Sequence, residues 1–163
     1  MGRNFDITDI GNDIIDSRDV QELYDDLISE QEDLEQAIKD ARAYLKLARE
    51  EYDPKDGDEH MDEALEALDD AEQELEGFNA DHASLMRDIE DAMEQVSEWQ
   101  YGETLIHERH WVEYVEELCN ELGYVNTTDV WWIEIDWKAT AKNVAMDYVT
   151  IDLDGHTYYA RSV

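Results

Sequence analysis

The sequence has almost none of the residues that cross-link a chain or interrupt its helices. Its 163 residues include one cysteine, Cys119, and one proline, Pro54. A single cysteine gives no disulfide framework, which is typical of proteins from a reducing compartment. We therefore expect a cytoplasmic protein, in which Cys119 is a buried structural thiol on the apolar side of a helix.

Long apolar runs are missing too. No run approaches the roughly 20 residues that a transmembrane helix requires. The N-terminal sequence MGRNFDITDIG also lacks the apolar centre of a signal peptide. The sequence therefore predicts a protein that does not enter the membrane.

Positively charged residues are also few. The chain carries 12 Lys and Arg against 45 Asp and Glu, a formal net charge of −33. Such a chain repels nucleic acid and anionic lipid, and its field attracts basic surfaces. We expect a basic protein surface as the partner, with no nucleic acid bound directly.

The acids are not spread evenly, as they would be in an acidic protein of the halophilic kind. Residues 1–98 have a net charge of −25 and residues 99–163 a net charge of −8, and all five tryptophans lie in the second part. Aromatic content and regular apolar spacing argue against disorder. The composition predicts a head (1–18), an acidic helical hairpin (19–99) and a C-terminal module (100–163).

Apolar spacing in the first half predicts a coiled coil. Steps of four and three residues connect positions 20, 24, 27, 31, 34, 38, 41, 45, 48 and 52, with Asp16 or Ser17 as the helix cap. Gln31 is the single polar residue on this seam, and such a residue commonly fixes register. After the DPKDGD turn, a second seam runs from Met61 through Leu65, Leu68 and Ala71 to Trp99. Two long helices joined by a short turn predict an antiparallel hairpin.

The stretch DEALEALDDAEQELE, residues 62–76, holds eight acids and no lysine or arginine. At the four-residue spacing, Asp62 faces Glu66 and Asp70 faces Glu74. Each such pair of like charges destabilises a helix by roughly 0.2–0.5 kcal/mol. A segment that keeps this repulsion throughout requires a functional explanation.

The second half predicts a small α+β module. ETLIHERHWVEYVEELCNEL favours one amphipathic helix with Ile106, Tyr114, Val115, Leu118 and Leu122 inward, ended by Gly123. VWWIEI favours a strand, and DWKATAKNVAM a short helix capped by Asp136. YVTIDLDGHTYYAR predicts a hairpin with Asp154 and Gly155 in a type I′ turn. The fold class is therefore mainly α: a long antiparallel helical hairpin followed by a small α+β C-terminal module.

The residues suited to chemistry do not point to an enzyme. His107 and His110 are three residues apart, so both reach one helical face, but they lack the spacing of a metalloprotease motif, and surface histidines are the favoured interpretation. DPKDGDEHMDE fails as a calcium loop because its first ligand position falls on Tyr52. There is no nucleophile elbow and no phosphate loop. We expect no catalytic residue, no metal and no cofactor.

The tail aromatics are candidates for core or dimer contacts, because aromatic residues dominate both. If VWWIEI is a strand, its two adjacent tryptophans point to opposite faces, so one of them is free for a subunit interface. The candidates are Trp131, Trp132, Trp137 and Tyr158.

Charge spacing in the hairpin predicts a function. Two antiparallel helices, each with a carboxylate every 4–5 Å, reach about one charge per 2 Å, close to the one per 1.7 Å of duplex DNA. A rod of about 50 Å matches the length of roughly 15 base pairs. Such an anion can occupy a groove that tracks phosphates with Lys and Arg. The candidate phosphate mimics are Asp25, Asp26, Glu32, Asp33, Asp62, Glu63, Glu66, Asp69, Asp70, Glu72, Glu74 and Glu76.

Residues 101–161, with GETLIHERHWVEYVEELCNELG and the spaced elements IDW, DY, DG and YYAR, resemble the C-terminal part of ArdA-type antirestriction proteins of phages and mobile elements. Upstream, the predicted helical hairpin departs from the small mixed modules of that family. The resemblance implies an elongated acidic dimer that mimics DNA and blocks type I restriction-modification enzymes. It implies framework roles for Asp136, Trp137, Asp154, Gly155, Tyr158 and Arg161, and a charged surface formed by Glu113, Glu116, Glu117 and Glu121.

The sequence thus predicts a non-enzymatic, phage-type DNA mimic that acts as a homodimer in the host cytoplasm. Two alternatives remain open. One is an anti-CRISPR protein that blocks the nucleic-acid channel of an effector complex, because that channel is also a basic groove. The other is an acidic coiled-coil adaptor, although charges at the e and g positions mostly fail to alternate in sign as such pairing requires.

Overall fold

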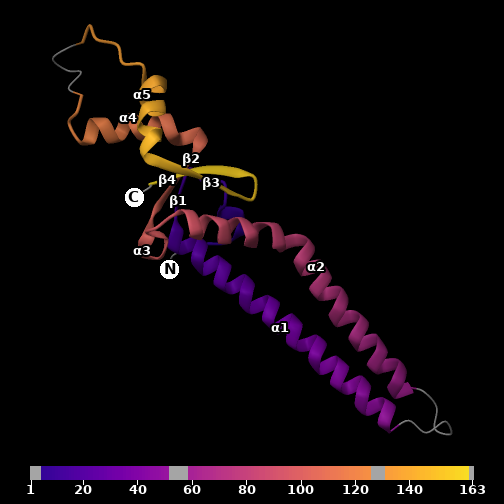
Figure 1. Cartoon of the computed structure of the whole chain (residues 1–163). Helices are drawn as coiled ribbons and strands as arrows, with labels where there is room; N and C mark the ends of the chain where they lie inside the picture. The colour runs from indigo at the N-terminus through magenta and orange to yellow at the C-terminus, as the bar shows by residue number, and fades with distance from the viewer. Residues whose placement is uncertain (1–4, 52–58, 126–130, 162–163) are drawn as a thin grey trace. The chain divides into compact units, whose positions relative to one another are not determined.

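The computed structural model describes residues 5–51, 59–125 and 131–161 of the chain. It contains two long helices packed together, a four-stranded antiparallel sheet and several short helices (Figure 1). The fold class predicted from the sequence is therefore confirmed. Two compact units are present: the sheet unit, Met1–Tyr24 with Arg87–Val163, and the hairpin unit, Asp25–Met86.

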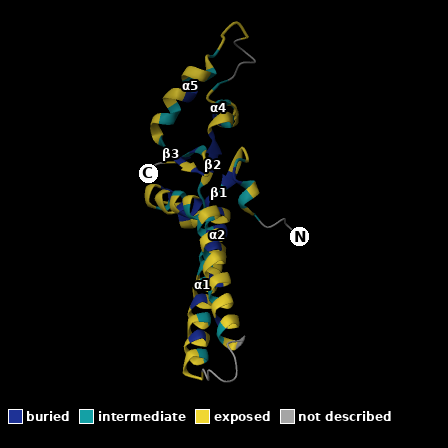
Figure 2. Ribbon diagram, turned by 90° about the vertical axis from the view of Figure 1, so that its right-hand side faces the viewer, coloured by how far each residue is buried: buried dark blue, intermediate teal, exposed yellow. Residues whose placement is uncertain are grey.

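Helices α1 (Ser17–Glu50) and α2 (Glu59–Gln95) form the predicted hairpin. Every predicted seam position of α1 from Val20 to Ala48 is buried or half-buried, and the residues between them are mostly exposed (Figure 2). Hydrogen bonds from Gln31 to Asn79 and from Arg42 to Glu72 establish the antiparallel direction. The predicted DPKDGD turn and Tyr52 lie outside the described residues.

The seam of α2 differs from the prediction at one point. Leu65 was expected inside, but it is 46% exposed, and Ala64 is fully buried in its place. Steps from Met61 to Ala64 and then to Leu68 keep the alternation of three and four residues that continues to Trp99. A small alanine on the seam lets the helices approach, while the larger leucine beside it was the stronger hydrophobic signal in the sequence.

The sheet unit contains strands β1 (Ile14–Asp16), β2 (Thr104–His107), β3 (Tyr148–Leu153) and β4 (His156–Arg161) in the order β1-β2-β4-β3. The N-terminal segment is therefore no separate head, because β1 pairs with β2 and places Ile15 opposite Leu105. Ser17 also helps to hold the N-terminal segment in the sheet unit. Its buried hydroxyl donates to the Trp99 carbonyl (2.6 Å) and accepts from the Glu103 amide (2.7 Å).

Residues 104–110 correct the prediction of a single helix over this region. They form β2 and the short 3₁₀ helix η2 (Glu108–His110), and the α-helix, α4, covers only Trp111–Glu121. Leu105 and Ile106 are both buried, although neighbouring strand residues point to opposite faces. A strand with both faces covered buries both residues and pairs with β1 and β4, which a helix cannot do.

Trp111 is the centre of a core between the sheet, α4 and α5 (Trp137–Val144). Its ring stacks on Tyr159 at 4.4 Å, and its indole donates to the Ala141 carbonyl at 3.0 Å. Gly123 ends the region of α4 as predicted, with φ 69°, but Leu122 is exposed rather than inward. Cys119 is half-buried at the edge of this core, less enclosed than expected.

The segment that follows is not the predicted strand. Residues 131–135 have no strand pairing, and Val130 lies outside the described residues. The predictions downstream are confirmed: Asp136 caps α5 by accepting from the Ala139 amide, and Asp154 and Gly155 connect β3 to β4 with the two positive φ values of a type I′ turn. Among the described helices, none combines the length and apolar character needed to cross a membrane.

Candidate functional site

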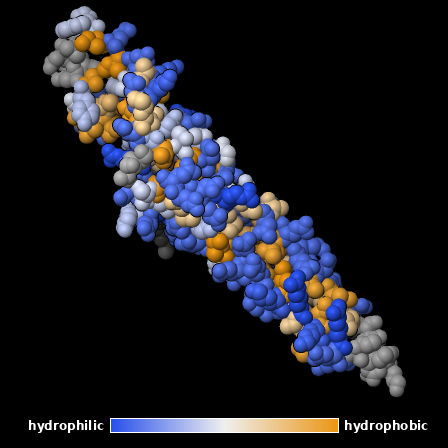
Figure 3. Space-filling view, in the orientation of Figure 1, coloured by the Kyte–Doolittle hydropathy of each residue, from blue (hydrophilic) through white to orange (hydrophobic). Residues whose placement is uncertain are grey.

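The hairpin unit concentrates negative charge on the surface of two helices. Its sequence contains 22 acids and five bases. The bases of its α1 part lie between Lys39 and Arg49, and the α2 part, residues 59–86, has ten acids with neither lysine nor arginine. On the face seen in Figure 3, hydrophilic side chains cover most of both helices, with apolar side chains between them.

The predicted phosphate mimics of the hairpin are all solvent-exposed. This holds for the eight acids of residues 62–76 and for Asp25, Asp26, Glu32 and Asp33. It follows from the seam, since the apolar positions of both helices face each other and leave the remaining positions to solvent. Further exposed acids share these positions and were not singled out from the sequence: Glu30, Glu35, Asp40 and Asp81.

Few of these carboxylates are paired with a cation in the described structure. Glu72 accepts from Arg42 at 3.0 Å, and Glu63 lies 3.6 Å from His60 Nδ1. Asp69 accepts from Gln73, which adds no charge. Both contacts are exposed, and exposed ion pairs are worth little individually. The surface of α2 therefore stays strongly anionic along its length.

The spacing of charge along the hairpin can be compared with DNA. The α1 and α2 parts of the hairpin unit carry 18 acids over helix lengths of about 40 Å, at a rise of about 1.5 Å per residue. This gives about one carboxylate per 2.2 Å, against one phosphate per 1.7 Å of duplex. After subtraction of four bases, the net density is about one charge per 3 Å. The linear charge density of the hairpin is therefore somewhat lower than that of the duplex.

The predicted tail residues take different positions. Glu113, Glu117 and Glu121 are exposed on α4 and Glu116 is half-buried. Tyr158 is fully buried and Trp137 half-buried, but Trp131 (81% exposed) and Trp132 (64% exposed) do not belong to the core. The two exposed indoles contact each other edge to face at 5.9 Å.

The two histidines considered as metal ligands are not on one helical face. His107 is on β2 and faces His156, whereas His110 is in η2 and lies 3.0 Å from Glu113. Within the described ranges, no group of three or more His, Cys, Asp or Glu side chains is arranged to hold a metal ion.

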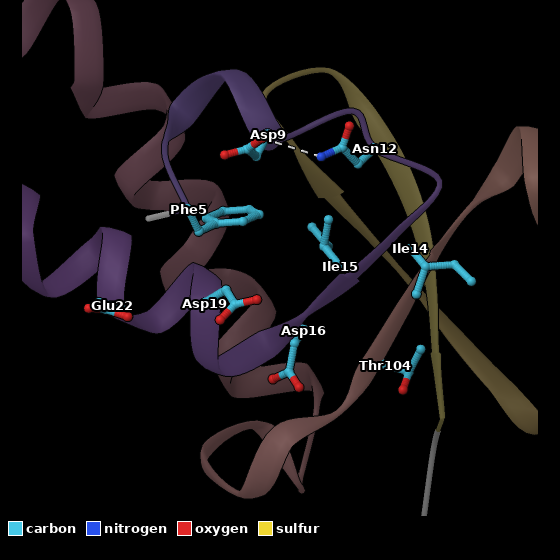
Figure 4. Close-up of a pocket in the computed structure, with 9 residues that line it drawn as sticks. All are labelled: Phe5, Asp9, Asn12, Ile14, Ile15, Asp16, Asp19, Glu22 and Thr104. Atoms are coloured by element: carbon cyan, nitrogen blue, oxygen red, sulfur yellow. Dashed lines mark hydrogen bonds between the residues drawn. The ribbon is translucent and has the colours of Figure 1, made fainter. Parts of the chain in front are cut away.

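A hollow in the sheet unit is also lined by acids, among them Asp9, Asp16 and Asp19. It has a volume of about 540 Å³ and is shown in Figure 4, where Phe5 points toward Ile15 and Asp9 lies beside Asn12. Asp16 at its edge is held by Arg18 at 2.7 Å, and this hydrogen bond lowers the pKa of the Asp16 carboxyl. The hollow therefore adds to the negative surface of the sheet unit.

Comparison with protein-family models, with curated proteins and with solved structures finds no match to this chain. The resemblance to ArdA-type proteins therefore stays a prediction, based on residues 101–161 alone.

Proposed function

We propose that this protein is a non-enzymatic DNA mimic that binds the DNA-binding groove of a host defence nuclease. One observation carries the proposal: helix α2 exposes all eight acids of residues 62–76 while its apolar seam packs on α1. The repulsion within this segment lowers helix stability. Binding to a basic groove offsets that loss, because each phosphate-binding Lys or Arg of the groove gains a carboxylate partner.

The same geometry supports a nuclease that binds duplex DNA as the target. A groove that binds duplex DNA presents basic side chains over several base pairs, and the hairpin presents carboxylates over a comparable length. The resemblance of the tail favours a type I restriction-modification enzyme, or a related nuclease, in the host cytoplasm. The channel of a CRISPR effector complex presents similar chemistry, so it is the second target to test.

An adaptor that pairs with another coiled coil is less well supported. The seams of α1 and α2 are already packed inside the hairpin, so they are not available to a second coiled coil. Lysine and arginine also do not alternate with acids along both helices. They occur between residues 39 and 49 of α1, but α2 has neither between residues 59 and 86.

We also propose a homodimer formed through the region of Trp131 and Trp132. Residues 131–146 contain two acids and two bases, so this region is electrically balanced in a chain of net charge −33. Two copies can approach here without the repulsion that acts elsewhere. Exposed Trp131, Trp132 and Met146 supply apolar area for such a contact.

Competition for a nuclease tests the proposed function directly. A type I enzyme and a CRISPR effector complex, each bound to labelled duplex, are titrated with the protein at low and at moderate salt. Displacement of the duplex, weakening as salt rises, is the expected result. If neither complex releases its duplex at low salt, direct occupancy of the groove is wrong.

Charge reversal locates the active surface. Changing Asp62, Glu66, Asp70 and Glu74 to Lys keeps helix-forming residues at exposed positions and should abolish displacement. The matched control exchanges Asp62→Glu, Glu66→Asp, Asp70→Glu and Glu74→Asp, which preserves every charge and should preserve displacement. If the lysine variant still displaces the duplex, the active surface lies outside the hairpin.

The dimer is tested separately by sedimentation. Trp131→Ala with Trp132→Ala should give a monomer with an unchanged circular dichroism spectrum, since both side chains are exposed. Tyr101→Ala removes another exposed aromatic residue and should leave the dimer intact. A wild-type monomer at all concentrations would contradict the dimer proposal and leave the groove proposal unaffected.

A further inference from the structure

Two histidines meet beneath the N-terminal loop of the sheet unit. Nε2 of His107 on β2 lies 3.1 Å from Nδ1 of His156 on β4. His107 is 7% exposed, and its ring also contacts Tyr158 edge to face at 5.1 Å. Neither histidine belongs to the acidic hairpin, so the proposed function does not use this pair.

The hydrogen bonds around the pair determine where its protons are. Nδ1 of His107 accepts from the Arg109 amide at 3.2 Å, so a neutral His107 carries its proton on Nε2. That N–H donates to Nδ1 of His156, which leaves the His156 proton on Nε2. Two neutral rings therefore satisfy every contact between these groups.

A third proton has no position that keeps these contacts. If Nδ1 of His107 is protonated, its N–H points at the Arg109 N–H. If instead Nδ1 of His156 is protonated while Nε2 of His107 keeps its proton, the two ring N–H groups point at each other. Every placement of the added proton thus sets one donor against another, which opposes protonation of the intact pair.

The pair also supports the loop of residues 10–13, which precedes β1. Gly11 has φ +106°, and a Cβ atom there would lie 3.1 Å from the ring of His156. The Gly11 amide donates to the Tyr158 hydroxyl at 2.7 Å, and the same hydroxyl donates to the Asn12 carbonyl at 3.1 Å. Arg109 donates to the Gly11 carbonyl at 2.7 Å and to Asp13 at 2.6 Å.

We propose that the His107–His156 pair is an acid-sensitive latch that holds the loop of residues 10–13, and with it edge strand β1, on the sheet. A proton forces the two rings apart, and half-buried His156 is the ring with access to solvent. Its departure removes the surface on which Gly11 packs. The His107 amide, which donates to the Asp13 carbonyl at 2.8 Å, then loses a partner on the loop side.

Charged groups near His107 both lower and raise the pKa of its ring. Burial, Arg109 and His156 lower the pKa of His107, in that order, whereas Glu108 and Asp13 raise it by a smaller amount. Tyr158 also faces the ring but stays neutral, because burial raises the pKa of its phenol. With the His107 pKa below its unfolded value, the unfolded chain takes up the proton first, so the local structure loses stability as the pH falls below about 6.5.

The test uses the full-length chain labelled with ¹⁵N. Imidazole shifts are recorded between about pH 7.5 and pH 4.5, a range that brackets the ordinary histidine pKa near 6.5, and hydrogen-exchange protection is measured for the Gly11 amide. We expect His107 to titrate below the ordinary histidine pKa of about 6.5. Gly11 protection should fall as the pair titrates, by about tenfold for each pKa unit of the shift.

The latch would be overturned if the pair took up its proton at or above the ordinary histidine pKa of about 6.5, or if Gly11 protection did not change as the pair titrated. Absence of any titration down to the lowest pH would overturn it too. The double substitution His107→Gln and His156→Gln should make Gly11 protection independent of pH. His60→Gln is the matched control and should leave the wild-type response intact.

Discussion

The side-chain amide of Gln31 on α1 donates a hydrogen bond over 2.9 Å to Oδ1 of Asn79 on α2. Both residues are half-buried, Gln31 on the seam of α1 and Asn79 beside the seam residue Phe78 of α2. This polar pair is satisfied in one register only, so it disfavours sliding of one helix along the other.

Removal of one member of this pair should destabilise the hairpin. Gln31→Ala leaves the Asn79 amide without its partner and should lower the free energy of unfolding by about 1–2 kcal/mol. Gln31→Leu together with Asn79→Leu should restore or raise it, because two apolar residues replace both polar groups. Urea unfolding monitored by circular dichroism measures both variants. Equal loss in the single and double variants would show that the hydrogen bond is not the relevant interaction.

Ser17 should contribute more than its size suggests. Ser17→Ala leaves the part-buried Glu103 amide without its acceptor and the Trp99 carbonyl without its donor, so we expect a loss of about 2–3 kcal/mol in unfolding free energy. Ser29→Ala is the matched control at an exposed position of the same helix and should change stability by less than about 0.5 kcal/mol. Similar values for the two variants would contradict the role given to the Ser17 hydroxyl.

Salt should stabilise the protein. Carboxylates four residues apart on α2 repel each other by roughly 0.2–0.5 kcal/mol per pair, and salt screens this repulsion. The midpoint of thermal unfolding should therefore rise as sodium chloride increases from about 0.05 M to about 0.5 M. Neutralisation by Asp62→Asn, Glu66→Gln, Asp70→Asn and Glu74→Gln should raise the low-salt midpoint and reduce its salt dependence. A midpoint that falls with salt would indicate that attractive ion pairs dominate instead.

Two glycines should respond in opposite directions to the same substitution. Gly77 lies within α2, and a Cβ atom there would meet nothing within 4 Å, so Gly77→Ala should stabilise the protein by about 0.5–1 kcal/mol. Gly155 has φ 78° in the β3–β4 turn, so Gly155→Ala should destabilise it by about 1–2 kcal/mol. Calorimetry of both variants measures the difference. Equal effects would show that backbone conformation does not decide the outcome at these positions.

The sequence predicted the long elements well because their signals are local and repeated. Seam positions from Val20 to Ala48 recur in alternating steps of four and three residues over nine places, and the Asp154–Gly155 turn is a two-residue signal between two strands. The single error in the α2 seam, Leu65 in place of Ala64, came from the greater hydrophobicity of leucine. Which residues of a helix are buried depends on how the whole helix is rotated about its axis, and not on the hydrophobicity of one side chain.

The errors in the tail share a different cause. The segment of residues 104–107 is compatible with the helical pattern that follows it, and only pairing with β1 and β4, each distant in sequence, makes it a strand. VWWIEI has the composition of a strand but lacks such a partner among the described residues, so its tryptophans are exposed. Pairing of His107 with His156 was likewise absent from any local pattern, since the two residues are 49 positions apart.

The sequence by itself determined the helical hairpin, the positions of its exposed carboxylates and the predominance of negative charge, because helical periodicity and charge are properties of short segments. Only the tertiary structure decided that the N-terminal segment joins the sheet, that Trp131 and Trp132 are outside the core, and that two histidines meet beneath the Gly11 loop. These features depend on contacts between distant segments, which form only where both partners fit one backbone arrangement.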